Sequence, residues 1–132
     1  MIIASMLGAV VVAGFVLCGL ALFTAWTARQ VEKQLPPPGR FVDVDGARIH
    51  YLDEGTGPCV LLVHGLAGQM HNFTHSLLGR LLKHGLRVVI LDRPGSGYST
   101  RPAHASATLA AQAQIISRFC EELSLGRLLV VG

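Results

Sequence analysis

The sequence predicts an α/β fold with parallel strands, preceded by one transmembrane helix. Three observations support this prediction. The first stretch of the 132 residues is apolar and uncharged, and all 11 Lys and Arg and all 8 Asp and Glu lie from Arg29 onward. After it, short apolar runs alternate with amphipathic helical segments, which is the pattern of a sheet covered by helices. Glycine-containing loops follow two of these apolar runs. The apolar content of 51% excludes a disordered chain.

The apolar stretch Ile2–Ala28 is long enough to cross about 30 Å of hydrocarbon as a helix. Trp26 lies near its end, where an indole suits the membrane–water interface. A cleaved signal peptide is the alternative, but no Lys or Arg precedes the stretch, and it exceeds the usual apolar core of about 7–15 residues. We therefore expect residues 1–28 to be an uncleaved, single-pass anchor whose residues 2–28 contact the lipid bilayer.

A proline-rich linker is expected over residues 29–39, because the run Pro36–Gly39 cannot continue a helix and favours an extended spacer. The folded region then covers residues 40–132. By the positive-inside rule this region is expected in the cytoplasm, since the C-terminal flank of the anchor is basic. The basic residues of this flank are Arg29, Lys33 and Arg40.

The folded region begins with a predicted β-hairpin over Arg40–Asp53, because Asp45-Gly46 suits a type I′ turn between apolar strands. Short continuous apolar runs follow the hairpin, and such runs are typical of strands that are covered on both faces of a sheet. Three such strands are predicted, at Cys59–Val63, Arg87–Leu91 and Leu128–Val131.

Two helices are predicted between these strands. The first covers about Asn72–Lys83, with an apolar stripe formed by Phe73, Leu77, Leu78, Leu81 and Leu82. The second runs from Ser106 or Thr108 to Leu123, with one side formed by Leu109, Ile116, Cys120 and Leu123. Strands that alternate with helices in this way pair in parallel.

The loops after the first two of these strands carry the candidate site. They are His64-Gly65-Leu66-Ala67-Gly68 and Asp92-Arg93-Pro94-Gly95-Ser96-Gly97-Tyr98-Ser99. Glycine lets the backbone turn sharply, so that N–H groups can point into a cleft and stabilise an oxyanion. Ligands of open α/β sheets bind at the carboxyl ends of the strands. The candidate cleft residues are His64, Gly65, Gly68, Asp92, Gly95 and Gly97.

Together with the hairpin, these loops resemble the N-terminal part of the α/β-hydrolase fold enzymes, over roughly Phe41–Gly132. The resemblance implies that the N–H of Leu66 contributes to an oxyanion hole. It also implies that His64 is a structural hydrogen-bonding residue and not the catalytic base, and that the Asp92 loop shapes the cleft. An uncharged, ester-like small molecule is the implied substrate, and no cofactor is implied.

The family's nucleophile lies in G-x-S-x-G, directly after the strand that matches Leu128–Val131. Gly132 would then be the first glycine of this turn, and the nucleophile, acid and catalytic histidine would follow it. We therefore expect the N-terminal part of a hydrolase, truncated at this turn and inactive by itself. An esterase-like or lipase-like enzyme is favoured. The alternatives are an Asp-nucleophile dehalogenase or epoxide hydrolase, and a non-enzymatic membrane protein.

Other interpretations of the same loops are weaker. Ser96 and Ser99 lie outside a G-x-S-x-G pattern and are expected to be turn residues. The loop also lacks the third glycine of a dinucleotide-binding fingerprint, since Thr100 takes that position. Asp92 is expected to bond Arg93 or a loop amide.

Metal, disulfide and nucleic-acid functions are not indicated. His71 and His75 share a helical spacing, but Asn72 stands where a zinc protease needs Glu. Cys18, Cys59 and Cys120 form no Cys-x-x-Cys motif. The basic residues that give the net charge of +3 are scattered singly, without the cluster that nucleic acid requires. The sequence leaves the oligomeric state open.

Overall fold

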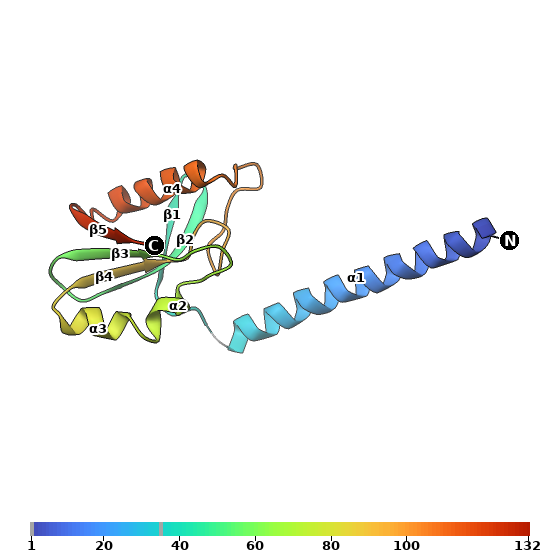
Figure 1. The fold of residues 1–132 in the computed structure, drawn as a ribbon, viewed down its shortest axis with the longest axis horizontal. Helices are drawn as coiled ribbons and strands as arrows, with labels where there is room; N and C mark the ends of the chain where they lie inside the picture. Colours follow the sequence, from blue (N-terminus) through green and yellow to red (C-terminus); the bar gives the residue numbers. More distant parts are fainter. Residues whose placement is uncertain (1, 35) are drawn as a thin grey trace. The chain divides into compact units, whose positions relative to one another are not determined.

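A computed structural model describes residues 2–34 and 36–132 and divides the chain into two compact units (Figure 1). The units are Met1–Pro37 and Pro38–Gly132. The first contains one long helix, and the second contains a five-stranded sheet with helices on both faces.

The helix of the first unit, α1, covers Ile2–Gln34. By length and composition, its segment Gly8–Gln30 can cross a membrane. The helix continues past Ala28, so the expected linker boundary at residue 29 is wrong. The reason is local, because Arg29–Gln34 contains neither glycine nor proline to end a helix.

The sheet has the strand order β1-β2-β4-β3-β5. Its strands are β1 (Arg40–Val44), β2 (Ala47–Glu54), β3 (Cys59–Val63), β4 (Arg87–Leu91) and β5 (Leu128–Val131). The predicted α/β class is confirmed, although the sheet is mixed. β3 runs parallel to β4 and β5, whereas β2 runs antiparallel to both β1 and β4. Asp45 and Gly46 both have positive φ, 48° and 77°, as the predicted type I′ turn requires.

Helix α4 (Leu109–Glu122) covers one face of the sheet (Figure 1). Ile115 and Phe119 are its buried residues, and the Phe119 ring meets the Tyr51 ring edge-on at 5.2 Å. The prediction that Leu109 belongs to this packed side is wrong, because its side chain is 76% exposed. Leu109 lies in the first turn, after the N-cap Thr108, whereas the buried stripe is centred on Ile115 and Phe119.

Two short helices, α2 (His71–Thr74) and α3 (Leu78–Lys83), cover the opposite face (Figure 1). A single helix over Asn72–Lys83 was expected, and the break is a correction. The Thr74 hydroxyl donates to the carbonyl of His71 at 3.2 Å and thereby competes for the acceptor of the next helical N–H. The predicted apolar stripe is nevertheless packed against the buried cluster on this face; its members are Phe73, Leu77, Leu78, Leu81 and Leu82.

Candidate functional site

The ends of three strands meet at one edge of the sheet. Val63, the last residue of β3, pairs with Leu91, the last residue of β4. His64 and Asp92 therefore begin their loops side by side. Val131 pairs with Leu62, and Gly132 lies against the carbonyl of Val63. The structure thus brings both glycine loops and Gly132 to the same edge, where ligands of such sheets bind.

The loop after β3 forms a tight turn. The Gly68 N–H donates to the Gly65 carbonyl at 3.2 Å, and Ala67 has a positive φ of 57°. Leu66 occupies the second position of this turn and is 97% exposed. Within the described part of the chain, the Leu66 N–H has no hydrogen-bond acceptor. It is therefore a free backbone donor beside the strand ends.

His64 is buried between the two loops. Its Nε2 accepts the backbone N–H of Arg93 at 3.0 Å, and its Nδ1 contacts the Gly65 carbonyl at 2.9 Å. Because a carbonyl only accepts, these partners assign a neutral imidazole with its proton on Nδ1. Both ring nitrogens are occupied. This geometry supports the structural role expected for His64.

Asp92 is 1% exposed, and its carboxylate has three hydrogen-bond partners. Oδ1 accepts the N–H of Met70 at 2.8 Å. Oδ2 accepts the N–H of Tyr98 at 3.1 Å and lies 2.8 Å from Nδ1 of His50. The expected loop-amide bonds are present. The alternative partner, Arg93, is not used, because its guanidinium bonds other groups. Nε and Nη2 donate to Gln112 Oε1 at 3.0 and 2.7 Å, and Nη1 donates to the His64 carbonyl at 3.4 Å.

Sequence reasoning missed His50, which is fully buried on β2. Its signal is its position between the apolar residues Ile49 and Tyr51 of a hairpin strand. A histidine that is buried in such a place needs hydrogen-bond partners for its ring nitrogens. The second nitrogen, Nε2, lies 2.6 Å from the carbonyl of Pro38.

Ser99, His50 and Asp92 lie together but do not form a catalytic triad. The Ser99 hydroxyl donates to the main-chain carbonyl of Asp92 at 2.7 Å and accepts the main-chain N–H of His50 at 2.9 Å. A triad needs Nε2 of the histidine at the serine, and here Pro38 occupies it. Ser96 donates its backbone N–H to the Arg93 carbonyl at 2.8 Å. Both serines are therefore turn residues, as predicted.

The Asp92 carboxylate leaves no room for a side chain at position 97, so glycine is needed there. Its φ is 53°, and a Cβ atom at this position would overlap the carboxylate group. Gly68 has a related role, because a Cβ there would come within 3.1 Å of His64 and Asn72. Gly95 has a φ of 82° and faces the side chain of Arg101. The glycines of both loops thus serve close packing and turn geometry.

Several titratable groups outside the two loops have shifted pKa values that follow from their packing, among them the carboxyl of Asp53 and the thiols of Cys59 and Cys120. The Arg87 guanidinium forms a two-bond ion pair with Asp53, at 2.8 and 2.7 Å, and these hydrogen bonds lower the pKa of Asp53. Burial raises the pKa of the thiols of Cys59 and Cys120, which makes both poor nucleophiles. Among the described residues, no group of His, Cys, Asp and Glu is arranged to hold a metal ion.

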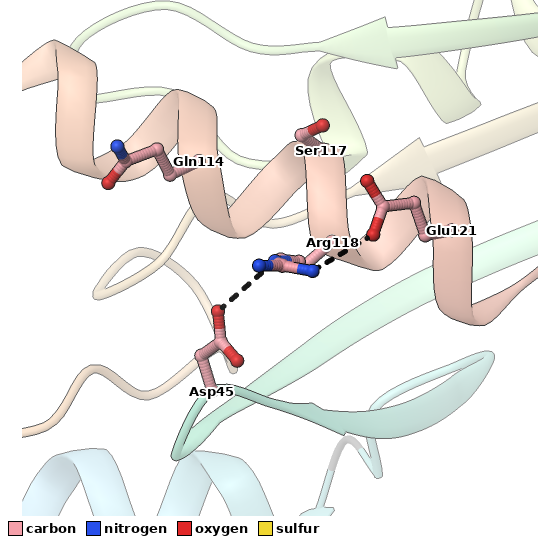
Figure 2. A pocket seen from close by; sticks show the side chains of 5 residues that line it. All are labelled: Asp45, Gln114, Ser117, Arg118 and Glu121. Carbon is pink, nitrogen blue, oxygen red and sulfur yellow. Dashed lines mark hydrogen bonds and ion pairs between the residues drawn. The ribbon is translucent and has the colours of Figure 1, made fainter.

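A surface pocket lies between helix α4 and the turn that joins β1 and β2 (Figure 2). Arg118 stands at its centre, 4.0 Å from Asp45 Oδ2 and 3.3 Å from Glu121 Oε2. All three side chains are more than 60% exposed. Exposed ion pairs of this kind contribute little to stability. The lining also includes Ser117, which forms no hydrogen bond with Glu121 in the described part of the structure.

Comparisons with known proteins agree with this arrangement. A family model described as "alpha/beta hydrolase fold" matches residues 58–132. Haloalkane dehalogenase 2 of Mycobacterium tuberculosis is 39% identical over 106 residues, covering 76% of this chain and 35% of that protein. The chain therefore spans about a third of the length of such curated relatives.

Solved structures that are similar to the chain include an esterase and a phospholipase. An esterase from Exiguobacterium antarcticum has a TM-score of 0.64 and 29% identity, covering 71% of this chain and 35% of its own. A structure titled as a membrane phospholipase A and bacterial virulence factor has a TM-score of 0.64 and 30% identity. The second match covers 97% of this chain and 42% of the phospholipase. It therefore extends into the helix α1.

Proposed function

This chain belongs to the α/β-hydrolase fold family, and from that premise we propose that it supplies the oxyanion-binding loop of a membrane-anchored acyl hydrolase. The substrate would be an uncharged ester, such as the acyl ester of a lipid. The observation that carries the proposal is the free N–H of Leu66 beside the ends of β3, β4 and β5.

The register of β5 supports a nucleophile next to this N–H. Gly132 lies against Val63, so a residue that follows Gly132 in the same direction would lie beside His64. A serine two positions after Gly132, as in G-x-S-x-G, would then be next to the turn that carries Leu66. Its hydroxyl oxygen would attack the ester carbonyl, while the hydroxyl proton would pass to the catalytic histidine that the family's order places after the nucleophile. The oxygen of that carbonyl would become negative and would be held by two N–H groups, one of them from Leu66.

Helix α1 supports a substrate at a membrane. Its segment Gly8–Gln30 is long and apolar enough to cross a bilayer. The match to the membrane phospholipase A extends over this helix, whereas the match to the esterase covers 71% of the chain. We infer an uncleaved anchor that holds the catalytic part at the lipid surface, on the cytoplasmic side that the basic residue Arg29 favours.

A dehalogenase is the second candidate, and the 39% identity to a haloalkane dehalogenase favours it. Such an enzyme of this fold would attack carbon with an Asp carboxylate instead of attacking a carbonyl with Ser. The two candidates share β1 to β5 and differ in the nucleophile. The substrate therefore distinguishes them directly.

The test uses the protein made from the complete coding sequence, reconstituted into vesicles. We expect hydrolysis of phosphatidylcholine and of p-nitrophenyl esters, and no release of halide from haloalkanes. Leu66→Pro removes the N–H at a turn position that accepts proline, and should lower kcat by about 10²–10³. Leu66→Ala keeps the N–H and is the matched control. Equal activity of the two variants, or halide release without ester hydrolysis, would contradict the proposal.

A further inference from the structure

The loop of residues 64–68, which carries Leu66, is called the oxyanion loop below. Outside this loop, the most prominent buried polar contact is the one between His50 and Asp92. Their side chains are 0% and 1% exposed, and Nδ1 lies 2.8 Å from Oδ2. Every polar atom of the pair has a partner, through Pro38, Met70 and Tyr98. The pair therefore forms a closed polar network inside an apolar fold, at a place where the reaction does not use either residue.

Counting hydrogen-bond donors assigns the protons of the pair. The carbonyl of Pro38 can only accept, so Nε2 of His50 carries a proton. The Asp92 carboxylate already accepts two backbone N–H groups, and hydrogen bonds to the charged form favour that form. Nδ1 must then donate to Oδ2. We infer from this count that His50 is an imidazolium and Asp92 a carboxylate.

The surroundings of His50 are consistent with one compensated positive charge. The ring of Phe41 packs on it at 4.9 Å, and the ring of Tyr98 meets it edge-on at 5.2 Å. The cationic side chain of Arg48 lies over Phe41, 4.2 Å from the ring centroid. Asp92 is thus the carboxylate that faces the imidazole, and it balances the charge.

We propose that the His50–Asp92 ion pair is the positioning device of the oxyanion loop. The loop is fastened at its start, where Arg93 donates to His64, and at its end, where Met70 donates to Asp92. Between these two points lies Leu66. Through Nε2, His50 extends the network to Pro38, the first residue of the folded unit. The pair thus joins the entry of the chain to both loops of the site.

The role in positioning rests on the proposed function, but its test does not use a substrate. The protein made from the complete coding sequence is studied by NMR in phospholipid nanodiscs at pH 7.5. We expect both ring nitrogens of His50 to give protonated ¹⁵N signals, because each of them faces an acceptor oxygen. A neutral His50 ring in the wild-type protein would overturn the proposal, whether or not any variant folds.

Asp92→Asn removes the charge and keeps the shape. Its amide nitrogen would replace Oδ2, so it would donate to Nδ1 and would no longer accept the Tyr98 N–H. His50 should then become neutral, with its proton on Nε2. Hydrogen exchange of the Met70 amide should accelerate by about tenfold, because a charge-assisted bond becomes a neutral one. Asp53→Asn is the matched control, since Asp53 bonds Arg87 away from both loops. An unchanged His50 signal or unchanged Met70 exchange in folded Asp92→Asn would contradict the positioning role.

The results separate this proposal from the proposed function. If the NMR results are as expected and Leu66→Pro retains full ester hydrolysis, only the oxyanion role of Leu66 fails. If Leu66→Pro is impaired and His50 is neutral, only the ion pair fails.

Discussion

The backbone N–H of Arg93 donates to Nε2 of His64 at 3.0 Å, which joins the second residue of one strand-end loop to the first residue of the other. The Arg93 guanidinium adds a longer bond to the His64 carbonyl, at 3.4 Å, and donates to Gln112 on helix α4. Each loop therefore depends on the other for its shape. The candidate site is a property of both loops, and substitutions that disturb one should be detected in the other.

Gly97→Ala tests the close approach of this backbone to Asp92. The new Cβ would overlap the carboxylate, and φ is 53°, so we expect a loss of about 2–4 kcal/mol in the free energy of unfolding. Gly126→Ala is the matched control, because its φ is 63° but its Cβ would meet open space. It should cost about 1 kcal/mol. Urea denaturation of both variants measures the difference, and equal losses would contradict the packing described for Gly97.

Asp53→Asn tests the ion pair with Arg87. The pKa of Asp53 is lowered in the folded state, mainly by its hydrogen bonds with Arg87. The resulting stabilisation is present above the unfolded pKa of about 3.9 and is lost as the pH falls through the lower folded pKa. The variant should be less stable by about 1 kcal/mol at pH 7. Thermal unfolding should show this difference shrinking below pH 4, and a constant difference would contradict the assignment.

Phe119→Ala tests which side of α4 faces the sheet. Phe119 is fully buried and packs on Tyr51, so its removal should cost about 3–5 kcal/mol. Leu109→Ala, on the same helix, should change stability by less than about 0.5 kcal/mol because Leu109 is exposed. Chemical denaturation of both variants checks the order. A larger loss of stability in Leu109→Ala than in Phe119→Ala would mean that Leu109 packs against the sheet, as the sequence predicted.

Leu17→Arg tests whether α1 spans a bilayer. An arginine near the centre of a spanning helix costs about 2.5–3.5 kcal/mol on insertion scales. We expect a smaller membrane-inserted fraction in a translocon glycosylation assay. Thr27→Arg, near the end of the apolar segment, should insert normally because its side chain reaches the interface. Mass spectrometry of the wild-type protein should also find the N-terminus intact. A mature form that lacks α1 would instead show a cleaved signal sequence.

The regular elements were predictable because their signals are local. Each predicted strand is present, and the Asp45-Gly46 turn has the expected backbone. The break between α2 and α3 was not predictable, because it depends on the bond of Thr74 to the His71 carbonyl. The spacing of the apolar residues from Phe73 to Leu82 fits one continuous helix and two short helices equally well, so it could not reveal the break.

The least predictable part of the site was the role of His50. Its partner Asp92 lies 42 residues away in sequence, and the sequence suggested only Arg93 or a neighbouring amide. Pairing of β2 with β4 brings the two residues together, since Tyr51 is opposite Leu91. The glycine loops were predictable because glycines directly follow apolar strand runs in the sequence. A single buried histidine within a strand has no comparable sequence pattern.

The most direct test of the central claim is the nucleotide sequence that follows codon 132. The proposed function predicts a continuation of the type x-Ser-x-Gly, and the position of Gly132 beside Val63 would place that serine next to the Leu66 turn. An aspartate in place of that serine would favour the dehalogenase and contradict acyl transfer. A stop codon at position 133 would contradict the claim that this chain forms one side of a hydrolase active site.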